Sequence, residues 1–167
     1  NNSISKDRRA VEEKETVQVE AQIQIETIKS RYNEKARKDF DELLRSSQRL
    51  TFPKFKDINL SIIIVLYNQA HFSFLCLKSI LHHADVEYEV VIIDNASTDE
   101  TEDLLLQIDN AKVTRNKENI GFLKAVNQGS KVAKGKYVLL LNNDAVLEER
   151  SLSSAIHTIE KDGAIGA

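Results

Sequence analysis

Hydrophobic residues recur with a helical period in the first part of the chain and gather into short runs in the rest. From Ala21 to Leu43 they stand three or four positions apart with charged residues between them, which is typical of one apolar stripe on a long helix. Residues Val17 to Ile25 alternate apolar and polar side chains as a strand does, but continuity with the stripe favours helix there as well. The spacing averages slightly more than about 3.6 residues, so it does not ensure a regular left-handed coiled coil.

The rest of the chain alternates short apolar runs with amphipathic segments. Short runs rich in β-branched residues are typical of strands in a parallel sheet, and the segments between them repeat with a helical period. We predict strands at Leu60–Tyr67, Tyr88–Ile93, Lys112–Thr114 and Tyr137–Leu141, the last buried on both faces, and the start of another strand at Gly163–Ala167. We predict helices over Gln69–Ala84, through Leu104–Ile108, over Phe122–Ala133 and through Leu152–Ile159. This order implies an α/β fold with a mostly parallel, Rossmann-like sheet, flanking helices and right-handed crossovers, preceded by the long amphipathic helix.

Four residues are expected to shape the helices of this region. Ser97 and Glu100 have the spacing of a capping box, which would start the helix that follows them. Gly129 lies on the face expected to be buried, together with Phe122, so we predict that it lets its helix lie close to the sheet. Gly135 is expected to end that helix.

Glycine and proline divide the chain into two regions. All five glycines lie at or beyond Gly121 and the only proline is Pro53, so residues 1–52 contain no strong helix breaker. We predict a helical arm at 1–52, as a coiled coil or stalk, and a globular domain at 53–167 that is truncated at its C-terminus. The arm cannot bury its stripe alone, so residues 10–50 are expected to pack on the globular domain, on a second copy of the chain or on a neighbouring domain. Self-association and a connecting stalk are equally supported.

The composition is that of a soluble globular protein without an extended basic surface. Of 167 residues, 41% are hydrophobic and 29% are charged, and the formal net charge is −3, which argues against a nucleic-acid partner. Cys76 is the single cysteine, which excludes an internal disulfide and a cysteine-rich zinc site. No apolar run reaches the ~18 residues of a membrane span, and the charged N-terminus has no signal-peptide core. We therefore expect a cytoplasmic chain, either free or held at the inner face of the membrane by partners.

Polar side chains directly follow three of the predicted strands. Tyr67 and Asn68 end the first, Asp94 ends the second, and the triplet Asn142-Asn143-Asp144 ends the last. The triplet alone fits an Asx turn, in which Asn and Asp bond their own backbone, as well as it fits a ligand site. Open α/β sheets bind ligands beyond the carboxyl ends of their strands. There Asp94 offers acceptors to a base N–H or to sugar hydroxyls, and Asp144 offers a hard oxygen to Mg²⁺ or Mn²⁺.

The sequence has no glycine-rich phosphate loop, since neither G-x-G-x-x-G nor G-x-x-x-x-G-K-[ST] occurs. A carboxylate and its metal would have to neutralise the phosphate charge instead.

Three segments in order, SIIIVLYN, VVIIDNASTDET and NIGFLKAVNQGSKVAKGKYVLLLNND, together resemble the nucleotide-sugar half of family-two inverting glycosyltransferases with the GT-A fold, particularly the rhamnosyltransferase-like branch. The resemblance covers about Leu60 to Ala167 and none of the arm.

The resemblance implies a UDP- or dTDP-sugar donor, a divalent metal, Mg²⁺ or Mn²⁺, and transfer of the sugar with inversion to a glycan or lipid-linked acceptor. It implies that Asp94 contacts the base and that Tyr67 and Asn68 line the nucleotide pocket. Asn119 and Gly121 match the N-x-G positions near the nucleoside.

The resemblance also extends to the helix after Gly121 and to the last strand tip. Asn127 matches a helix-borne Asn near the nucleoside, although a bond from its side chain to the helix backbone explains it equally. Asp144 matches the last carboxylate of the D-x-D metal motif, whereas Asn142 departs from the first Asp, as it does in the rhamnosyltransferase-like branch. One protein carboxylate, with Asn142 and Asn143 beside it, would then face the metal. Lys124 has the reach to approach the diphosphate, but a solvated helix lysine explains it better.

The general base of the family is an Asp or Glu in the half that follows residue 167. The resemblance therefore implies an enzyme as the parent, and a chain that alone binds nucleotide weakly and turns over little or nothing. The rival hypothesis is a non-catalytic assembly module, in which the arm mediates docking and the globular part is a degenerate scaffold. Asn142 in place of Asp mildly favours this rival, and the retained Asp94 and Asp144 oppose it more strongly. The sugar, the base and the acceptor cannot be read from the sequence.

Overall fold

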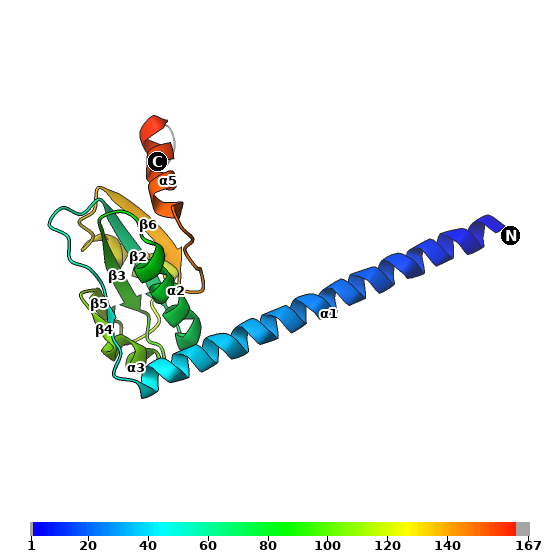
Figure 1. Cartoon of the computed structure of the whole chain (residues 1–167), viewed down its shortest axis with the longest axis horizontal. Helices are drawn as coiled ribbons and strands as arrows, with labels where there is room; N and C mark the ends of the chain where they lie inside the picture. The colour runs from blue at the N-terminus through cyan, green and yellow to red at the C-terminus, as the bar shows by residue number, and fades with distance from the viewer. Residues whose placement is uncertain (1, 163–167) are drawn as a thin grey trace. The chain divides into compact units, whose positions relative to one another are not determined.

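The computed structural model describes residues 2–162, and it describes side chains from Gln18 to Asp162. The chain forms two compact units, Asn1–Lys38 and Asp39–Ala167. One long helix, α1 (Asn2–Arg45), forms the first unit and continues into the second (Figure 1). Helix through Val17–Ile25 is confirmed, because the backbone is helical throughout this stretch and no glycine or proline precedes Pro53.

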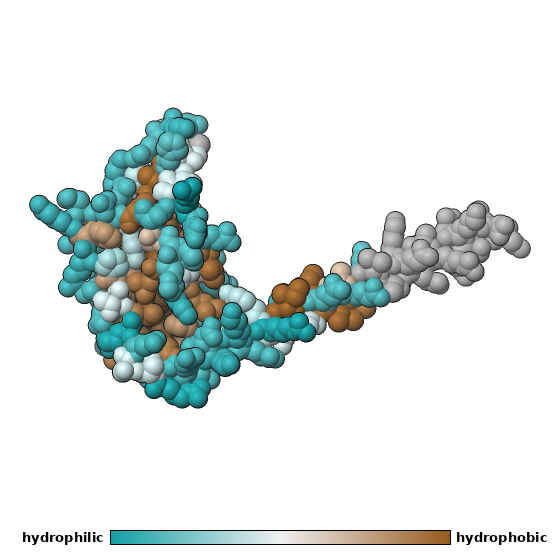
Figure 2. All heavy atoms as spheres, viewed as in Figure 1, coloured by the Kyte–Doolittle hydropathy of each residue, from teal (hydrophilic) through white to brown (hydrophobic). Residues whose placement is uncertain are grey.

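The described part of the first unit carries exposed apolar side chains. On the predicted stripe, Ile25, Ile28 and Tyr32 are 45%, 65% and 45% exposed, and Val19 and Ile23 on other faces of α1 are exposed as well. Apolar residues are visible along this part of α1 in Figure 2. The stripe expected from the sequence is therefore exposed from Ala21 to Tyr32, and it is buried at Ala36.

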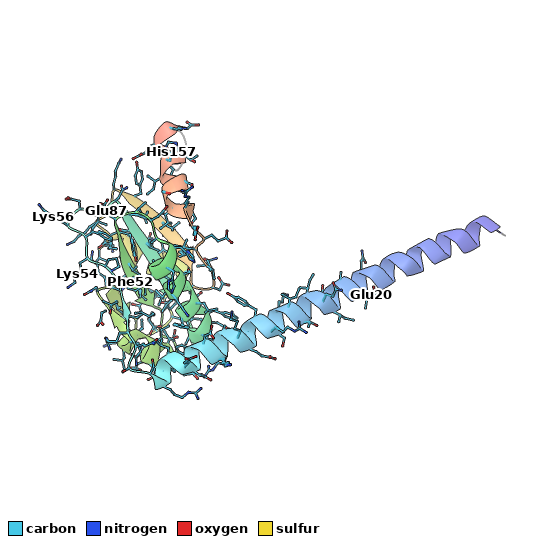
Figure 3. The ribbon with its side chains drawn as sticks, viewed as in Figure 1. Glu20, Phe52, Lys54, Lys56, Glu87 and His157 are labelled. Atoms are coloured by element: carbon cyan, nitrogen blue, oxygen red, sulfur yellow. The ribbon has the colours of Figure 1, made fainter. Side chains whose placement is uncertain are left out.

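The second unit begins inside α1. Phe40 and Leu43, in the last turns of α1, are buried in its core together with Phe52, which lies among the side chains of this unit (Figure 3). A short strand, β1 (Leu50–Thr51), pairs in parallel with β4 (Ile108–Asp109). Residues 39–52 thus pack with the α/β part of the chain, whereas the sequence assigns them to the arm because their apolar spacing continues the helical period.

Four parallel strands form the main sheet of the second unit, in the order β5-β3-β2-β6. They are β2 (Leu60–Leu66), β3 (Tyr88–Asp94), β5 (Lys112–Arg115) and β6 (Tyr137–Asn142). Each lies within one residue of its predicted bounds, and the parallel sheet with flanking helices confirms the predicted fold class (Figure 1).

Alternate residues of the central strands face two separate cores. Ile62 of β2 belongs to the larger core, which includes the buried side of α2 (Ala70–His83). Ile63 belongs to the smaller core on the other face, which α4 (Phe122–Ser130) covers. Because β2 is buried on both faces, its sequence is an unbroken apolar run rather than an alternating one.

Two further helices belong to the described part of this unit. α3 (Thr101–Leu106) and α5 (Ser151–Lys161) bury Leu104 and Leu152 in the larger core. The helix predicted through Ile108 ends earlier, because Ile108 belongs to β4 and pairs with β1. Among residues 2–162, no helix combines the length and the apolar character that crossing a membrane requires. The strand predicted at 163–167 lies outside the described residues.

The prediction that β6 is buried on both faces is wrong. Its burial alternates, with Val138 and Leu140 each 50% exposed while Leu139 and Leu141 pack against the larger core. In the described sheet β6 is an edge strand that pairs with β2 alone. An apolar run therefore marks a strand here without marking a central position in the sheet.

Gly129 and Gly135 both allow close packing. A Cβ on Gly129 would lie 2.8 Å from Cγ2 of Ile63, which confirms that this glycine lets α4 approach the sheet. The prediction that Gly135 ends the helix is wrong, since α4 stops at Ser130 and Gly135 instead lies against the backbone of β2. The prediction that Phe122 lies on the buried face of α4 is wrong: Phe122 is 57% exposed, at the first residue of the helix and about 10.5 Å along its axis from Gly129.

Candidate functional site

The carboxyl ends of all four strands of the main sheet lie at one edge. The register pairs Leu66 with Asp94, Asp94 with Arg115, and Val65 with Asn142. The loops that follow these residues therefore emerge together. In an open parallel α/β sheet this is the edge at which ligands bind.

The loop after β2 is tied to the loop after β3 by reciprocal hydrogen bonds. The backbone N–H of Asn68 donates to Oγ of Ser97 at 2.8 Å, and the N–H of Thr98 donates to Oδ1 of Asn68 at 2.8 Å. Asn68, Gln69 and Ala96 all have left-handed backbones, with φ of 58°, 63° and 67°. Non-glycine residues seldom adopt this conformation, and where they do they are often found at functional sites.

Tyr67 contributes an exposed aromatic ring to this edge. Its side chain is 52% exposed, although it directly follows a strand that is buried on both faces. A large aromatic group held in solvent at a strand tip offers a flat surface to a ligand.

Asp99 fixes the starts of two helices and was missed by the sequence reasoning. Its Oδ2 accepts from the N–H of Ala70, the first residue of α2, at 2.9 Å, and its Oδ1 accepts from the N–H of Thr101, the first residue of α3, at 3.1 Å. The predicted capping box is wrong, because Glu100 makes no side-chain cap and Oγ of Ser97 accepts from Asn68 instead. An acid two residues before a helix start is an Asx-type signal that could have revealed this role.

Asp94 is fully buried beneath Arg115. Its Oδ1 accepts from the N–H of Ser97 at 3.0 Å, and its Oδ2 lies 2.9 Å from Nε of Arg115. Nη1 of Arg115 also reaches Oε2 of Glu102 at 2.6 Å. The hydrogen bond to Glu102 is the main cause that raises the pKa of Arg115, so this guanidinium stays charged. The guanidinium of Arg115 thus lies directly against the buried carboxylate of Asp94.

Asn95 joins the loops after β3 and β5, and sequence reasoning gave it no role. It is 2% exposed, and its Nδ2 donates to Oδ1 of Asn119 at 2.7 Å. Its Oδ1 accepts from Nδ2 of Asn116 and from the N–H of Ile120, both at 3.1 Å. A buried amide whose two ends are both satisfied by another loop holds that loop in one conformation.

Asn119 and Gly121 lie together in this loop, at the start of α4. Oδ1 of Asn119 accepts from the N–H of Gly121 at 2.9 Å. Gly121 has φ 84° and ψ 154°, a region that is essentially restricted to glycine. Asn127 is exposed in the second turn of α4, about 7.5 Å along the helix axis from Phe122, so it is not part of this loop.

The Asn142-Asn143-Asp144 triplet follows β6 at the same edge. Nδ2 of Asn143 donates to Oγ of Ser73 on α2 at 3.0 Å, and the carbonyl of Asn142 accepts from Sγ of Cys76 at 3.4 Å. Asp144 is exposed. Burial, followed by the negative charge of Asp144, raises the pKa of the Cys76 thiol to about 12, so that this thiol is neutral.

The donor set suits a metal that is shared with phosphate rather than one enclosed by protein. Among the residues whose side chains are described, no three His, Cys, Asp or Glu groups gather around one point. Asp144 presents an exposed, hard carboxylate oxygen at this edge, next to the amide side chains of Asn142 and Asn143. Mg²⁺ is commonly held in this way, by one or two carboxylates with substrate phosphates and water as the remaining ligands.

Two solved structures share the fold of the second unit. The sheet resembles that of S. aureus TarS 1–349 in complex with UDP, with a TM-score of 0.54 at 29% identity over 62% of this chain and 32% of TarS. The mannosyltransferase PcManGT from Pyrobaculum calidifontis, in complex with GDP-Man and Mn²⁺, shares the fold with a TM-score of 0.55 at 22% identity, over 77% of this chain and 39% of that enzyme. The fold is thus that of a glycosyltransferase domain of the GT-A type.

The chain belongs to glycosyl transferase family 2, whose family model matches residues 61–167. It is 32% identical over 104 residues to the Escherichia coli UDP-Glc:alpha-D-GlcNAc-diphosphoundecaprenol beta-1,3-glucosyltransferase WfaP, covering 61% of this chain and 41% of WfaP. It is 23% identical over 109 residues to the glycosyltransferase GlyG of Streptococcus pneumoniae serotype 4, covering 63% of this chain and 36% of GlyG. The matched segments thus span less than half of either relative.

Proposed function

We propose that this chain is the donor-binding half of a metal-assisted glycosyltransferase, which transfers a sugar from a UDP- or dTDP-sugar to a saccharide or lipid-linked acceptor with inversion. The observation that carries the proposal is that polar loops after four parallel strands meet at one edge in a chain of family 2. Support for a nucleotide donor comes from TarS, which was solved with UDP, and from WfaP, which is named for UDP-Glc. We propose the cytoplasm as the compartment of this chain.

The loops after β2, β3 and β5 would bind the nucleoside. The exposed ring of Tyr67 and the adjoining Asn68 would line the pocket, while Asn119 and Gly121, held by Asn95, would form its opposite side. The reciprocal bonds between these loops fix their shape before the donor arrives. A preformed pocket loses less conformational entropy when it binds.

Asp144 would hold the diphosphate through Mg²⁺ or Mn²⁺. When bound, the metal would neutralise negative charge on the departing nucleoside diphosphate. Asn142 and Asn143 would support the turn that presents Asp144, since Asn143 is anchored to Ser73 of α2. Inversion also requires a general base, which we assign to the part of such enzymes that this chain does not match, since the matched segments span 41% of WfaP and 36% of GlyG. The chain alone is therefore expected to bind the donor with little or no turnover.

Calorimetry of the chain with UDP and dTDP, with and without Mn²⁺, tests this proposal. We expect binding that depends on Mn²⁺ and is lost in the Asp144→Ala variant. Glu148→Gln is the matched control, because it removes another exposed carboxylate four residues further along, and it should bind as the wild type does. Absence of binding to either nucleotide with Mn²⁺ present would refute the proposal.

A second function, assembly through α1, is supported by a separate observation. Ile25 and Ile28 lie on one stripe and are 45% and 65% exposed. We propose that this stripe binds a second copy of the chain or a neighbouring domain. Analytical ultracentrifugation of the chain should detect concentration-dependent dimers that Ile25→Asp with Ile28→Asp abolishes, whereas Gln24→Asp leaves them unchanged. A wild-type chain that stays monomeric at all concentrations would exclude the second copy.

A further inference from the structure

The guanidinium of Arg115 lies between two carboxylates that differ in exposure. Nε is 2.9 Å from Oδ2 of Asp94, whose side chain is 0% exposed, and Nη1 is 2.6 Å from Oε2 of Glu102, whose side chain is 63% exposed. Nη2 donates to the backbone carbonyl of Ser97 at 3.3 Å. One cation thus covers a buried acid while an exposed acid anchors it.

The fold places these three groups together from three different elements. Arg115 is the last residue of β5 and the register partner of Asp94 at the end of β3. Glu102 stands in the first turn of α3, whose start is fixed by the carboxylate of Asp99. The arrangement therefore follows from the sheet register and a helix cap rather than from a chance surface encounter.

Oδ2 of Asp94 is held by the ion pair with Arg115 and still has unused acceptor positions. Oδ1 accepts from the N–H of Ser97, but Oδ2 accepts no aligned hydrogen bond from the described residues despite its closeness to Nε of Arg115. An ionised carboxylate has about four acceptor positions, and buried polar atoms nearly always use at least one. Because the ion pair with Arg115 leaves Oδ2 without an aligned hydrogen bond from the described residues, this atom keeps acceptor positions for a group that a ligand brings to this edge.

We propose that Arg115 is a positioning residue, which covers Asp94 in the nucleotide-free chain and moves toward Glu102 when a uracil or thymine base binds. Oδ2 of Asp94 then accepts the ring N–H of the base. The guanidinium rotates about its bond to Glu102, so its charge stays close to Asp94 throughout. This inference rests on the proposed donor-binding function and adds to it the way in which the base pocket opens.

Removal of the Glu102 charge tests this inference, with calorimetry of UDP binding in the presence of Mn²⁺ as the measurement. Glu102→Gln keeps the shape of the side chain but removes the charge that draws Arg115 off Asp94. We expect the Kd for UDP to rise about twofold to fivefold, the range for loss of a partly exposed ion pair. Asp103→Asn, at the next exposed acid of α3, is the control and should leave the Kd unchanged.

A modified nucleotide separates positioning from a structural role. UDP methylated at N3 of uracil has no ring N–H, so it cannot bond Oδ2 of Asp94. We expect Glu102→Gln and the wild type to bind this analogue equally. If Glu102→Gln binds UDP as tightly as the wild type, or weakens UDP and the analogue by the same factor, the inference fails while the proposed function stands. If the wild type binds no UDP with Mn²⁺, both fail.

Discussion

Gly135 lies against the backbone of β2, where no side chain has room. A Cβ at this position would come 2.7 Å from the carbonyl carbon of Leu60 and 2.9 Å from the carbonyl oxygen of Tyr137, and closer still to the nitrogen of Ser61. All three atoms belong to the backbone of paired strands, so a change of rotamer cannot relieve the contact. Gly135→Ala should therefore force β2 and β6 apart at the edge where both strands begin.

The size of the effect follows from these distances. Ordinary van der Waals contact starts at 3.4 Å, so the added methyl overlaps Leu60 by about 0.7 Å even at the second-nearest atom. Overpacking typically costs about 1–3 kcal/mol, and contact with immobile backbone places this case at or above the upper end, at about 3 kcal/mol. That is a large share of the roughly 5–15 kcal/mol by which domains are stable.

Urea unfolding followed by tyrosine fluorescence measures this cost. We expect a lower midpoint with an unchanged slope, which reports lost stability rather than a changed denatured state. Lys134→Ala is the control, because Lys134 is exposed and its bonds to Ser61 and Glu89 are made by its backbone N–H. A free energy of unfolding for Gly135→Ala within about 0.5 kcal/mol of that of the wild type would refute the predicted steric clash.

Three further predictions concern the core and the edge of the sheet. Asn95→Ala should cost about 2–4 kcal/mol in urea unfolding and speed amide exchange at Ile120, because it removes three hydrogen bonds; an unchanged exchange rate would contradict this. Cys76 should react with a thiol reagent at pH 8 only as fast as the chain unfolds, because burial and then the charge of Asp144 raise its pKa to about 12. Immediate labelling of the folded chain would contradict the burial of this thiol. The thiol of the unfolded chain ionises near pH 9, so the free energy of unfolding should fall as the pH rises from 9 toward 12. Leu140→Thr should lower the free energy of unfolding by less than about 1 kcal/mol, because Leu140 is 50% exposed. A decrease above about 2 kcal/mol would contradict this exposure.

The strands could be predicted from the sequence because their apolar runs are local signals. The run in β2 reflects real burial on both faces, whereas the run in β6 has the same appearance at an exposed edge. Nothing within six residues reveals which strand will be central, since that depends on the order of strands in the sheet. Sequence periodicity therefore predicts where the strands lie along the chain, but not which strands lie next to each other in the sheet.

The candidate site was only partly predictable, for the same reason. Asp94 was found as a polar residue at a strand tip, but its cover by Arg115 depends on the register between β3 and β5. Ser97 has the spacing of a capping residue, yet its hydroxyl bonds Asn68 from another loop. Asn95, whose side chain makes three hydrogen bonds at this edge, carries no local signal, because all three partners lie more than twenty residues away.

The reciprocal bonds between Asn68, Ser97 and Thr98, together with the carboxylate of Asp99 shared by two helices, have a consequence for protein engineering. A segment transplanted from a relative to alter nucleotide preference would lose its anchors if it replaced only one of these two loops. Both loops have to be exchanged as one cassette, and natural variation at one is expected to be matched by variation at the other.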